Sequence, residues 1–174
     1  GSDLKNFYEK YGGCVLSTSI NRYCYISIHP YFDENHTLLK YSENELVDSL
    51  SNIRHRIFNC VLNERQIHGV EIASTADIPG GTGLGSSSTY MSKGKLAEKA
   101  CEIEIEKLGS PIGKQDQYAA AYGGLNFIRF YPDGEVSVSP VMMRGETYQR
   151  LQKNLVMFYT GDTRSANSIL AEQK

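Results

Sequence analysis

One segment decides how this sequence is interpreted, and it reads Asp77-Ile78-Pro79-Gly80-Gly81-Thr82-Gly83-Leu84-Gly85-Ser86-Ser87-Ser88. Four glycines lie within six of its residues, and glycine lets a backbone approach a ligand closely or take a positive φ. A strand-like stretch from Val70 to Thr75 precedes it, and a helix is expected to begin at the serines. The free amides and partial positive charge of such a helix start form an anion site. The pattern predicts a phosphate-binding loop, with an ordinary flexible loop as the alternative.

Known phosphate-binding motifs differ from this segment in ways that bear on its chemistry. Gly80 and Gly85 have the spacing of the Walker A glycines, but Ser86 stands where that motif requires lysine. Gly81, Gly83 and Gly85 follow a G-x-G-x-G pattern, whereas dinucleotide-binding folds use G-x-G-x-x-G. Without the lysine, such a loop depends more on its amides, the helix dipole and a metal ion to hold phosphate.

The rest of the chain mixes helical and strand-like patterns without a regular alternation of the two. We expect helices over 4–11, from 43 to about 62, over 95–108, over 118–122 and beyond 163, and strands over 15–28, 70–75, 125–131, 135–141 and 155–159. Ser42-Glu43-Asn44-Glu45 fits the capping box of a helix start, and Pro132-Asp133-Gly134 fits a hairpin turn. This mixture predicts an α+β fold.

Composition argues against several classes of function. Lys plus Arg total 18 and Asp plus Glu total 20, without a basic stripe, so we expect no nucleic-acid partner. No apolar run approaches the ~18 residues that span a bilayer, and residues 1–5 have no apolar signal region, so we expect no membrane partner. The four cysteines are widely spaced, with no C-x-x-C, and their even count leaves two disulfides open. A chain of this size with a real core does not need disulfides, so we expect free, buried thiols and a cytoplasmic protein.

One glutamate of the expected helix 95–108 falls on its apolar face. At ~100° per residue, Leu96, Ala100 and Ile103 form an apolar stripe, and Glu104 lies inside it. An ionised carboxylate that faces a core is costly unless it is paired or binds a metal ion. The alternatives to a metal or catalytic role are a buried Arg or Lys partner, or a shallow stripe. The other glutamates of the segment, Glu98, Glu102 and Glu106, fall on the opposite face.

A second carboxylate follows this helix in Gly113-Lys114-Gln115-Asp116-Gln117. Asp116 precedes a short helical run that ends at Gly123-Gly124, and capping that helix is one role open to it. The other is a functional carboxylate that Lys114 and the helix start keep ionised.

Together these residues resemble the GHMP superfamily of small-molecule kinases. Pro79–Ser88 resembles its P-x-x-x-G-L-G-S-S phosphate loop, Ala100–Glu104 its A-x-E-x-E helix and Gly113–Asp116 its catalytic segment. The most similar subgroup is the D-glycero-D-manno-heptose 7-phosphate kinases and related sugar kinases, and this likeness rests on Phe7–Gly13, Asp77–Gly85, Gly113–Gly124 and the stretch 159–170. The short Thr89-Tyr90-Met91 stretch departs from the family, which has a long helix after the serines.

The resemblance implies a fold and a domain organisation. Residues 1–160 would form a GHMP kinase N-terminal ATP-binding domain (ribosomal protein S5 domain 2-like), a mixed sheet packed with helices. Residues 161–174 would begin a connection to a C-terminal domain that is absent from this sequence. Gly1-Ser2-Asp3 would be the tail of the family's G-G-G-[ST]-D motif, whose aspartate contacts the sugar.

The resemblance also implies an activity, which is transfer of the γ-phosphoryl group of ATP to a hydroxyl of a sugar or sugar phosphate. The expected acceptor is D-glycero-D-manno-heptose 7-phosphate, the cofactors are ATP and Mg²⁺, and a homodimer is one assembly open to the protein. Asp116 would act as the catalytic base, tuned by Lys114, while Ser87 and Glu104 would bind Mg²⁺. The residues expected to contact the sugar phosphate are Asp3, Asp116, Gly124 and Arg164. Those expected to hold ATP are Pro79, Gly80, Gly81, Thr82, Gly83, Leu84, Gly85, Ser86, Ser87 and Ser88.

Two other functions stay open at this stage. The chain could be a non-catalytic fragment that binds a nucleotide or a sugar phosphate, because the anion loop does not by itself require catalysis. It could also be a GHMP kinase that acts on another small-molecule alcohol. The loop is shared by all three, so it does not separate them.

Overall fold

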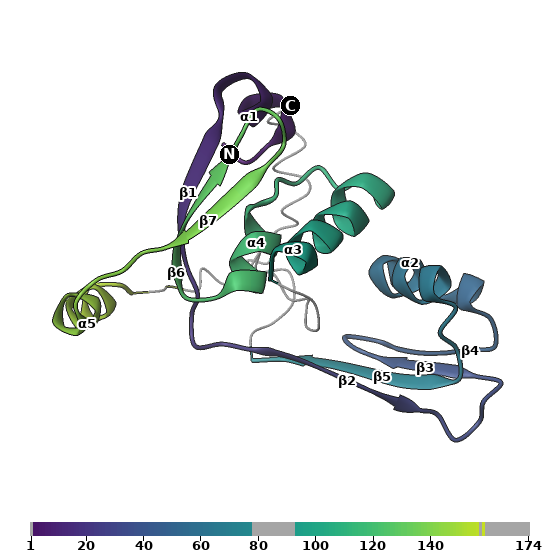
Figure 1. The fold of residues 1–174 in the computed structure, drawn as a ribbon. Helices are drawn as coiled ribbons and strands as arrows, with labels where there is room; N and C mark the ends of the chain where they lie inside the picture. Colours follow the sequence, from purple (N-terminus) through teal and green to yellow (C-terminus); the bar gives the residue numbers. More distant parts are fainter. Residues whose placement is uncertain (1, 78–92, 157, 159–174) are drawn as a thin grey trace.

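The structure, a computed structural model, describes residues 2–77, 93–156 and 158, and arranges them as two sheets with helices packed on them (Figure 1). The first sheet has three antiparallel strands in the order β1-β6-β7. They span Gly13–Thr18 (β1), Leu125–Phe130 (β6) and Val136–Pro140 (β7). The predicted hairpin is confirmed by β6 and β7, and β1 joins it from the other end of the chain with Gly13 opposite Phe130.

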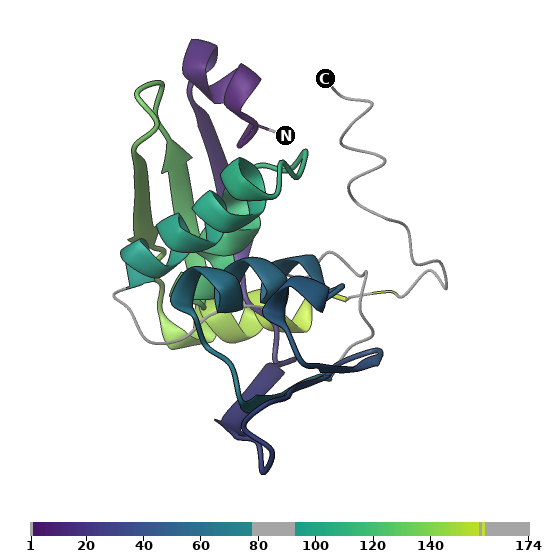
Figure 2. The same cartoon turned by 90° about the vertical axis from the view of Figure 1, so that its right-hand side faces the viewer.

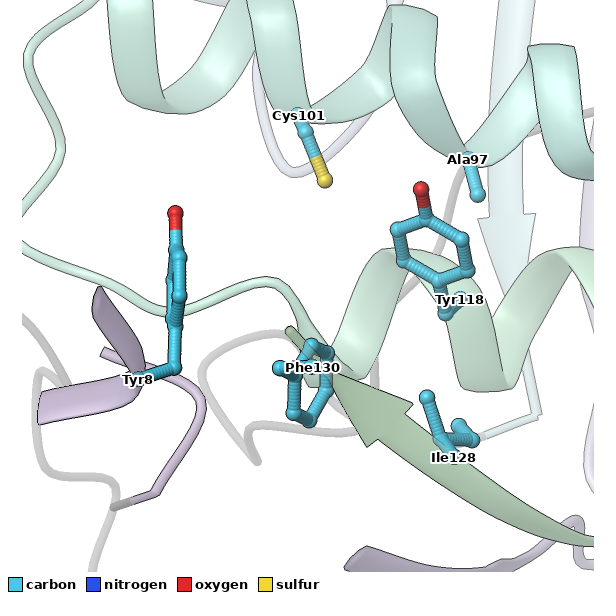
Figure 3. Packing of buried hydrophobic residues seen from close by; sticks show 6 residues of the cluster. All are labelled: Tyr8, Ala97, Cys101, Tyr118, Ile128 and Phe130. Carbon is cyan, nitrogen blue, oxygen red and sulfur yellow. The ribbon is translucent and has the colours of Figure 1, made fainter. Parts of the chain in front are cut away.

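Helices cover one face of this first sheet (Figure 2). They are α3 (Lys93–Cys101), its continuation η2 (Glu102–Lys107) and α4 (Gln115–Tyr122), while α1 (Lys5–Tyr11) lies at one end of the sheet. Side chains from α1, α3, α4 and β6 meet between these layers in the first core. Its buried members are Tyr8, Ala97, Cys101, Tyr118, Ile128 and Phe130 (Figure 3).

The second sheet is mixed, with strands in the order β2-β5-β3-β4. They span Cys24–Pro30 (β2), Val70–Ala76 (β5), Thr37–Lys40 (β3) and Asn44–Val47 (β4). β3 and β5 run parallel, and the other pairs are antiparallel. A single 3₁₀ turn, η1 (Leu50–Asn52), leads to α2 (Arg56–Arg65), which covers one face. The core between them contains Leu39, Val47, Ile53, Leu62 and Ile72. The α+β prediction, with mixed sheet and packed helices, is thereby confirmed.

The single strand predicted over 15–28 is wrong, because residues 19–23 divide it into β1 and β2, which join different sheets. The two sides of the break are attached to different partners. The amide of Ser19 donates to the carbonyl of Gly124 at 2.9 Å, whereas the amide of Tyr23 donates to the Asp77 carboxylate at 2.9 Å. Alternation along the chain shows that a stretch is extended but does not say which neighbour it pairs with.

The capping box predicted at Ser42 is also wrong, since Asn44–Val47 pairs with β3 and the helix begins only at Arg56. The buried Glu45 carboxylate accepts hydrogen bonds from the amides of Arg54 (2.7 Å) and His55 (3.1 Å), just before that helix. The His55 ring then accepts from the amide of Phe58 at 3.3 Å. Glu45 therefore stabilises the start of a helix, but that helix is α2, and Glu45 acts on it from strand β4.

Near the C-terminal end, two further differences from the sequence appear. The described residues of the expected strand 155–159, which are Leu155, Val156 and Phe158, are not in a strand. Helix α5 (Gly145–Lys153) was not predicted, and it buries none of its side chains.

All four cysteines are free, as expected, although Cys14 and Cys24 are exposed. Within 2–77, 93–156 and 158, no helix is long and apolar enough to cross a membrane.

Candidate active site

The first part of the candidate site is formed by Asp3 against the segment that enters α4. Asp3 is buried, with 5% of its surface exposed, and its Oδ2 accepts a hydrogen bond from the amide of Gln115 at 3.3 Å. Gly113 lies directly against the Asp3 carboxyl group, so closely that a Cβ at this position would overlap it. Glycine is therefore required at 113 for steric reasons, and the contact brings Asp3 to the start of α4.

Asp116 lies in the first turn of α4, close to Asp3. The residue as a whole is exposed, but enough protein surrounds its carboxyl group for burial to raise the pKa. The negative charge of Asp3 raises the pKa of Asp116 further. This carboxyl group is accessible to a substrate and is also a stronger base than an ordinary aspartate.

Glu104 faces inward, as its position in the helical period predicted. It is half-buried; burial raises its pKa, the nearby Asp116 carboxylate adds to this effect, and a hydrogen bond from Gln117 opposes it. Within the described part of the chain, no Arg or Lys forms an ion pair with Glu104. Of the alternatives left open by the sequence, a cationic partner is thus not found there.

The segment that carries Glu104 is not the continuous α-helix expected over 95–108. The α-helix ends at Cys101, and Glu102–Lys107 is π-helical, with the amide of Leu108 donating to the carbonyl of Ile103 at 3.0 Å. Such turns are rare and occur frequently at functional sites. The periodicity of 3.6 residues placed Glu104 on the correct face but could not show this local widening.

Gln117 is a site residue that the sequence reasoning did not identify. It is buried in α4 and reaches Glu104. Its amide can instead turn so that the nitrogen donates to the carbonyls of Gly113 and Lys114, each 3.2 Å away. The signal available in the sequence was its place one residue after Asp116.

Lys114 has a different environment from the one expected. Its ammonium group donates to the carbonyl of Gly134 at 2.9 Å and lies 5.0 Å from the centroid of the Tyr8 ring. A cation beside Asp116 would lower the pKa of that carboxyl group, but the pKa is raised. The expectation that Lys114 keeps Asp116 ionised does not match this geometry. Lys114 instead attaches the start of α4 to α1 and to the β6–β7 turn.

Gly124 is not brought to the carboxylates. It follows α4 at the end opposite Asp116, where Gly123 and Gly124 take φ values of 64° and 76° and end the helix. From Asp116 to Tyr122, the last residue of α4, the helix rises ~9 Å at 1.5 Å per residue, and Gly124 lies two residues beyond it.

The remaining predicted site residues, Pro79–Ser88 with Ser87, and Arg164, lie outside the described residues. Along the chain, β5 precedes this segment and α3 follows it. Of the two expected Mg²⁺ ligands, the structure thus describes only Glu104. In the described ranges, no three His, Cys, Asp or Glu side chains gather as a metal site.

No family model matches this chain, but known proteins are similar to it. A D-glycero-alpha-D-manno-heptose 7-phosphate kinase of Campylobacter jejuni is 28% identical over 201 positions, which cover all of this chain and 59% of that protein. A bifunctional fucokinase/GDP-fucose pyrophosphorylase of Arabidopsis thaliana is 29% identical over 118 residues, 59% of this chain and 11% of that protein.

A solved structure is similar as well. The D-glycero-D-manno-heptose 1-phosphate kinase from Bacteroides thetaiotaomicron superposes with a TM-score of 0.71 and 27% identity, over 83% of this chain and 56% of that one. The chain therefore spans less than two thirds of the length of these heptose kinases. In sequence and in fold, the predicted resemblance to heptose and related sugar kinases of the GHMP type is confirmed.

Proposed function

We propose that the protein to which this chain belongs is an ATP-dependent sugar kinase. It transfers the γ-phosphoryl group to a hydroxyl of a sugar or sugar phosphate, with D-glycero-D-manno-heptose 7-phosphate as the expected acceptor. The observation that carries the proposal is that Asp3, Glu104 and Asp116 converge at the start of α4. That convergence occurs in a chain similar to heptose phosphate kinases.

Asp116 is the proposed general base. In phosphoryl transfer the protein mainly positions the reactants and stabilises charge, and a carboxylate orients the attacking hydroxyl and accepts its proton. The raised pKa of Asp116 favours proton acceptance, and its exposure leaves room for the sugar. Asp3, whose carboxylate accepts a hydrogen bond from the Gln115 amide, would accept hydrogen bonds from other hydroxyls of the same sugar.

The cofactors are ATP and Mg²⁺ in this proposal. Glu104 fits a hard cation, because it offers a half-buried carboxylate that no described Lys or Arg neutralises. Together with Ser87 it would hold the metal ion, which would neutralise charge on the phosphates. The glycines and serines of 79–88 would hold the triphosphate through backbone amides.

Turnover of the full-length protein tests the proposal. ADP release is measured with heptose 7-phosphate and with unphosphorylated sugars, for the wild type and for Asp116→Asn. We expect release with the phosphorylated heptose and a loss of about 10² to 10⁴ in kcat for the variant, the usual contribution of a general base. Asp48→Asn is the control, because Asp48 accepts a hydrogen bond from Asn52 in the second-sheet half of the fold.

Three outcomes have distinct meanings. Near-normal turnover of Asp116→Asn removes the base from the mechanism. Release with another alcohol but not with the heptose points to a different acceptor. Binding of nucleotide and sugar phosphate without ADP release in the wild type supports the non-catalytic alternative.

A further inference from the structure

Helix α2 is joined to the segment that carries Glu104 by a group of four charges. Glu64, in the last turn of α2, has one carboxylate oxygen 2.7 Å from Nζ of Lys99 and the other 2.6 Å from Nζ of Lys107. Glu102 contacts the same two lysines at 2.9 and 3.0 Å. We call these four residues the Glu64 cluster. It links α2 to α3 and to both ends of η2.

The Glu64 cluster is more than an exposed ion pair. Its side chains are only 24–37% exposed, and each carboxylate contacts both ammonium groups. Isolated surface pairs contribute little, whereas networks with good geometry and partial burial contribute more. Hydrogen bonds from Lys107 and Lys99 lower the pKa of Glu64 to about 2, and bonds to Glu64 and Glu102 raise the pKa of both lysines. All four groups are therefore charged at neutral pH.

A second contact ties α2 to the same segment. The guanidinium group of Arg56, in the first turn of α2, donates to the carbonyl of Leu108 at 2.5 Å. Leu108 closes the π-helical turn, because its amide donates a hydrogen bond to the carbonyl of Ile103. Glu64 and Arg56 thus hold the segment Glu102–Leu108 from the two ends of one helix, and Glu104 lies within it.

Helix α2 is a firm support for this purpose. Leu62 is buried against the second sheet, and Glu45 accepts the amides just before the helix begins. A π-helical turn is uncommon and competes with a regular α-helix, which would rotate the following side chains. Contacts that hold the lysines on either side of the turn oppose that rotation.

We infer that Glu64 is a positioning residue, which holds Lys99 and Lys107 so that the π-helical turn directs Glu104 toward the metal ion. The inference rests on the proposed function, because it takes Glu104 as a ligand of Mg²⁺. Glu64 itself touches neither the metal ion nor the substrate. The predicted effect of its loss is therefore specific to the contribution of the metal to nucleotide binding.

The test measures ADP binding to the full-length protein by calorimetry, with Mg²⁺ and with EDTA. For Glu64→Gln we expect affinity in EDTA to stay unchanged and the enhancement by Mg²⁺ to fall about tenfold or more, as for other residues that orient metal ligands. Glu43→Gln is the matched control, because it removes one exposed ion pair, to Arg54 at 2.9 Å, outside the cluster. It should leave both affinities unchanged.

A double variant shows whether Glu64 acts through Glu104. If it does, Glu64→Gln has no further effect on the Mg²⁺ enhancement in a Glu104→Gln background, since coupled residues are not additive. Should Glu64→Gln fail to fold, Lys107→Gln breaks the cluster from the other side and tests the same expectation.

The outcomes separate this inference from the proposed function. Loss of the Mg²⁺ enhancement in Glu104→Gln but not in Glu64→Gln overturns the positioning role and keeps the metal site. A full enhancement in Glu104→Gln overturns the metal role on which both statements depend. Equal weakening of ADP binding with and without Mg²⁺ in Glu64→Gln shows a merely structural residue and also overturns the inference.

Discussion

At the scale of single residues, the candidate site depends on how closely Asp3 approaches the backbone at Gly113. The two residues lie far apart in the sequence, and their contact places the Asp3 carboxyl group beside that of Asp116. Two like charges in one place make proton binding to Asp116 more favourable. The contact that fixes Asp3 at Gly113 therefore also makes Asp116 a stronger base.

The approach of Asp3 makes Gly113 sensitive to substitution. In Gly113→Ala the added methyl group would overlap the Asp3 carboxyl group, so Asp3 has to move. We expect KM for the sugar to rise about tenfold, the loss of one good polar contact at 1.4 kcal/mol, with ADP affinity unchanged. Steady-state kinetics and calorimetry check this. Gly145→Ala, with open space around its Cβ and ordinary φ, is the control. An unaltered sugar KM in Gly113→Ala would contradict the role of Asp3.

The charge of Asp3 should also appear in the pH profile. The proposed base Asp116 would act in its ionised form, so we expect kcat/KM to rise with pH through a pKa above the ordinary 3.8. Asp3→Asn keeps an oxygen for the Gln115 amide but removes the negative charge. We expect the acid limb of kcat/KM to shift to lower pH, because the pKa of Asp116 falls. An unshifted limb would mean that the two carboxyl groups do not interact.

At the scale of elements, buried charges determine where helices begin and how they are held. Glu45, in β4, accepts hydrogen bonds from the residues that lead into α2, and the Tyr41 hydroxyl donates to it at 2.6 Å. Burial alone would raise the pKa of Glu45, but these three hydrogen bonds hold it below the ordinary value of 4.5. One carboxylate thus connects the second sheet to the helix that supports η2.

Removal of this charge should destabilise the fold. Glu45→Gln puts an NH₂ group against buried donors, so we expect a loss of about 1–3 kcal/mol in the free energy of unfolding, measured with urea at pH 7. The lowered pKa means that ionised Glu45 stabilises the fold at neutral pH and that this contribution disappears as the pH falls below 4.5. The difference from wild type should therefore shrink in acid. Glu43→Gln, on the surface, should cost less than about 1 kcal/mol. Equal losses in both variants would refute the argument.

At the scale of the whole molecule, two sheets with separate cores meet through the contact of α2 with η2 (Figures 1 and 2). Asp3, Glu104 and Asp116 all belong to the half built on the first sheet. Helix α2, in the half built on the second sheet, contacts Lys107 and Leu108 of the segment that carries Glu104.

Nucleotide binding should stabilise the protein through the metal ion. A ligand at 100 times its Kd stabilises the folded state by about 2.7 kcal/mol, so ADP with Mg²⁺ raises Tm by several degrees. We expect the increase to be smaller when EDTA removes the metal, and Glu104→Gln to show only the smaller increase in both conditions. Thermal unfolding in full-length protein checks this. Equal shifts with and without Mg²⁺ in the wild type would contradict the metal role.

The sequence by itself determined what depends on short spacings. The inward face of Glu104, the glycine stop of the short helix before Gly123 and the hairpin of β6 and β7 all follow from local periodicity and turn residues, although that helix begins at Gln115 and not at Tyr118 as expected. The phosphate loop at 79–88 stays a prediction, since it lies outside the described residues. Local patterns succeed here because the interactions that form these elements lie within a few residues of each other.

Only the tertiary structure decided which distant groups meet. The division of 15–28 between two sheets, the helix start prepared by Glu45 and the attachment of Lys114 to Tyr8 and Gly134 had no local signal. The same holds for Asp3 beside Gly113. Each of these depends on contacts between segments far apart in the chain, and no spacing within one segment specifies its partner in another. The sequence named the carboxylates of the site, and packing brought them together.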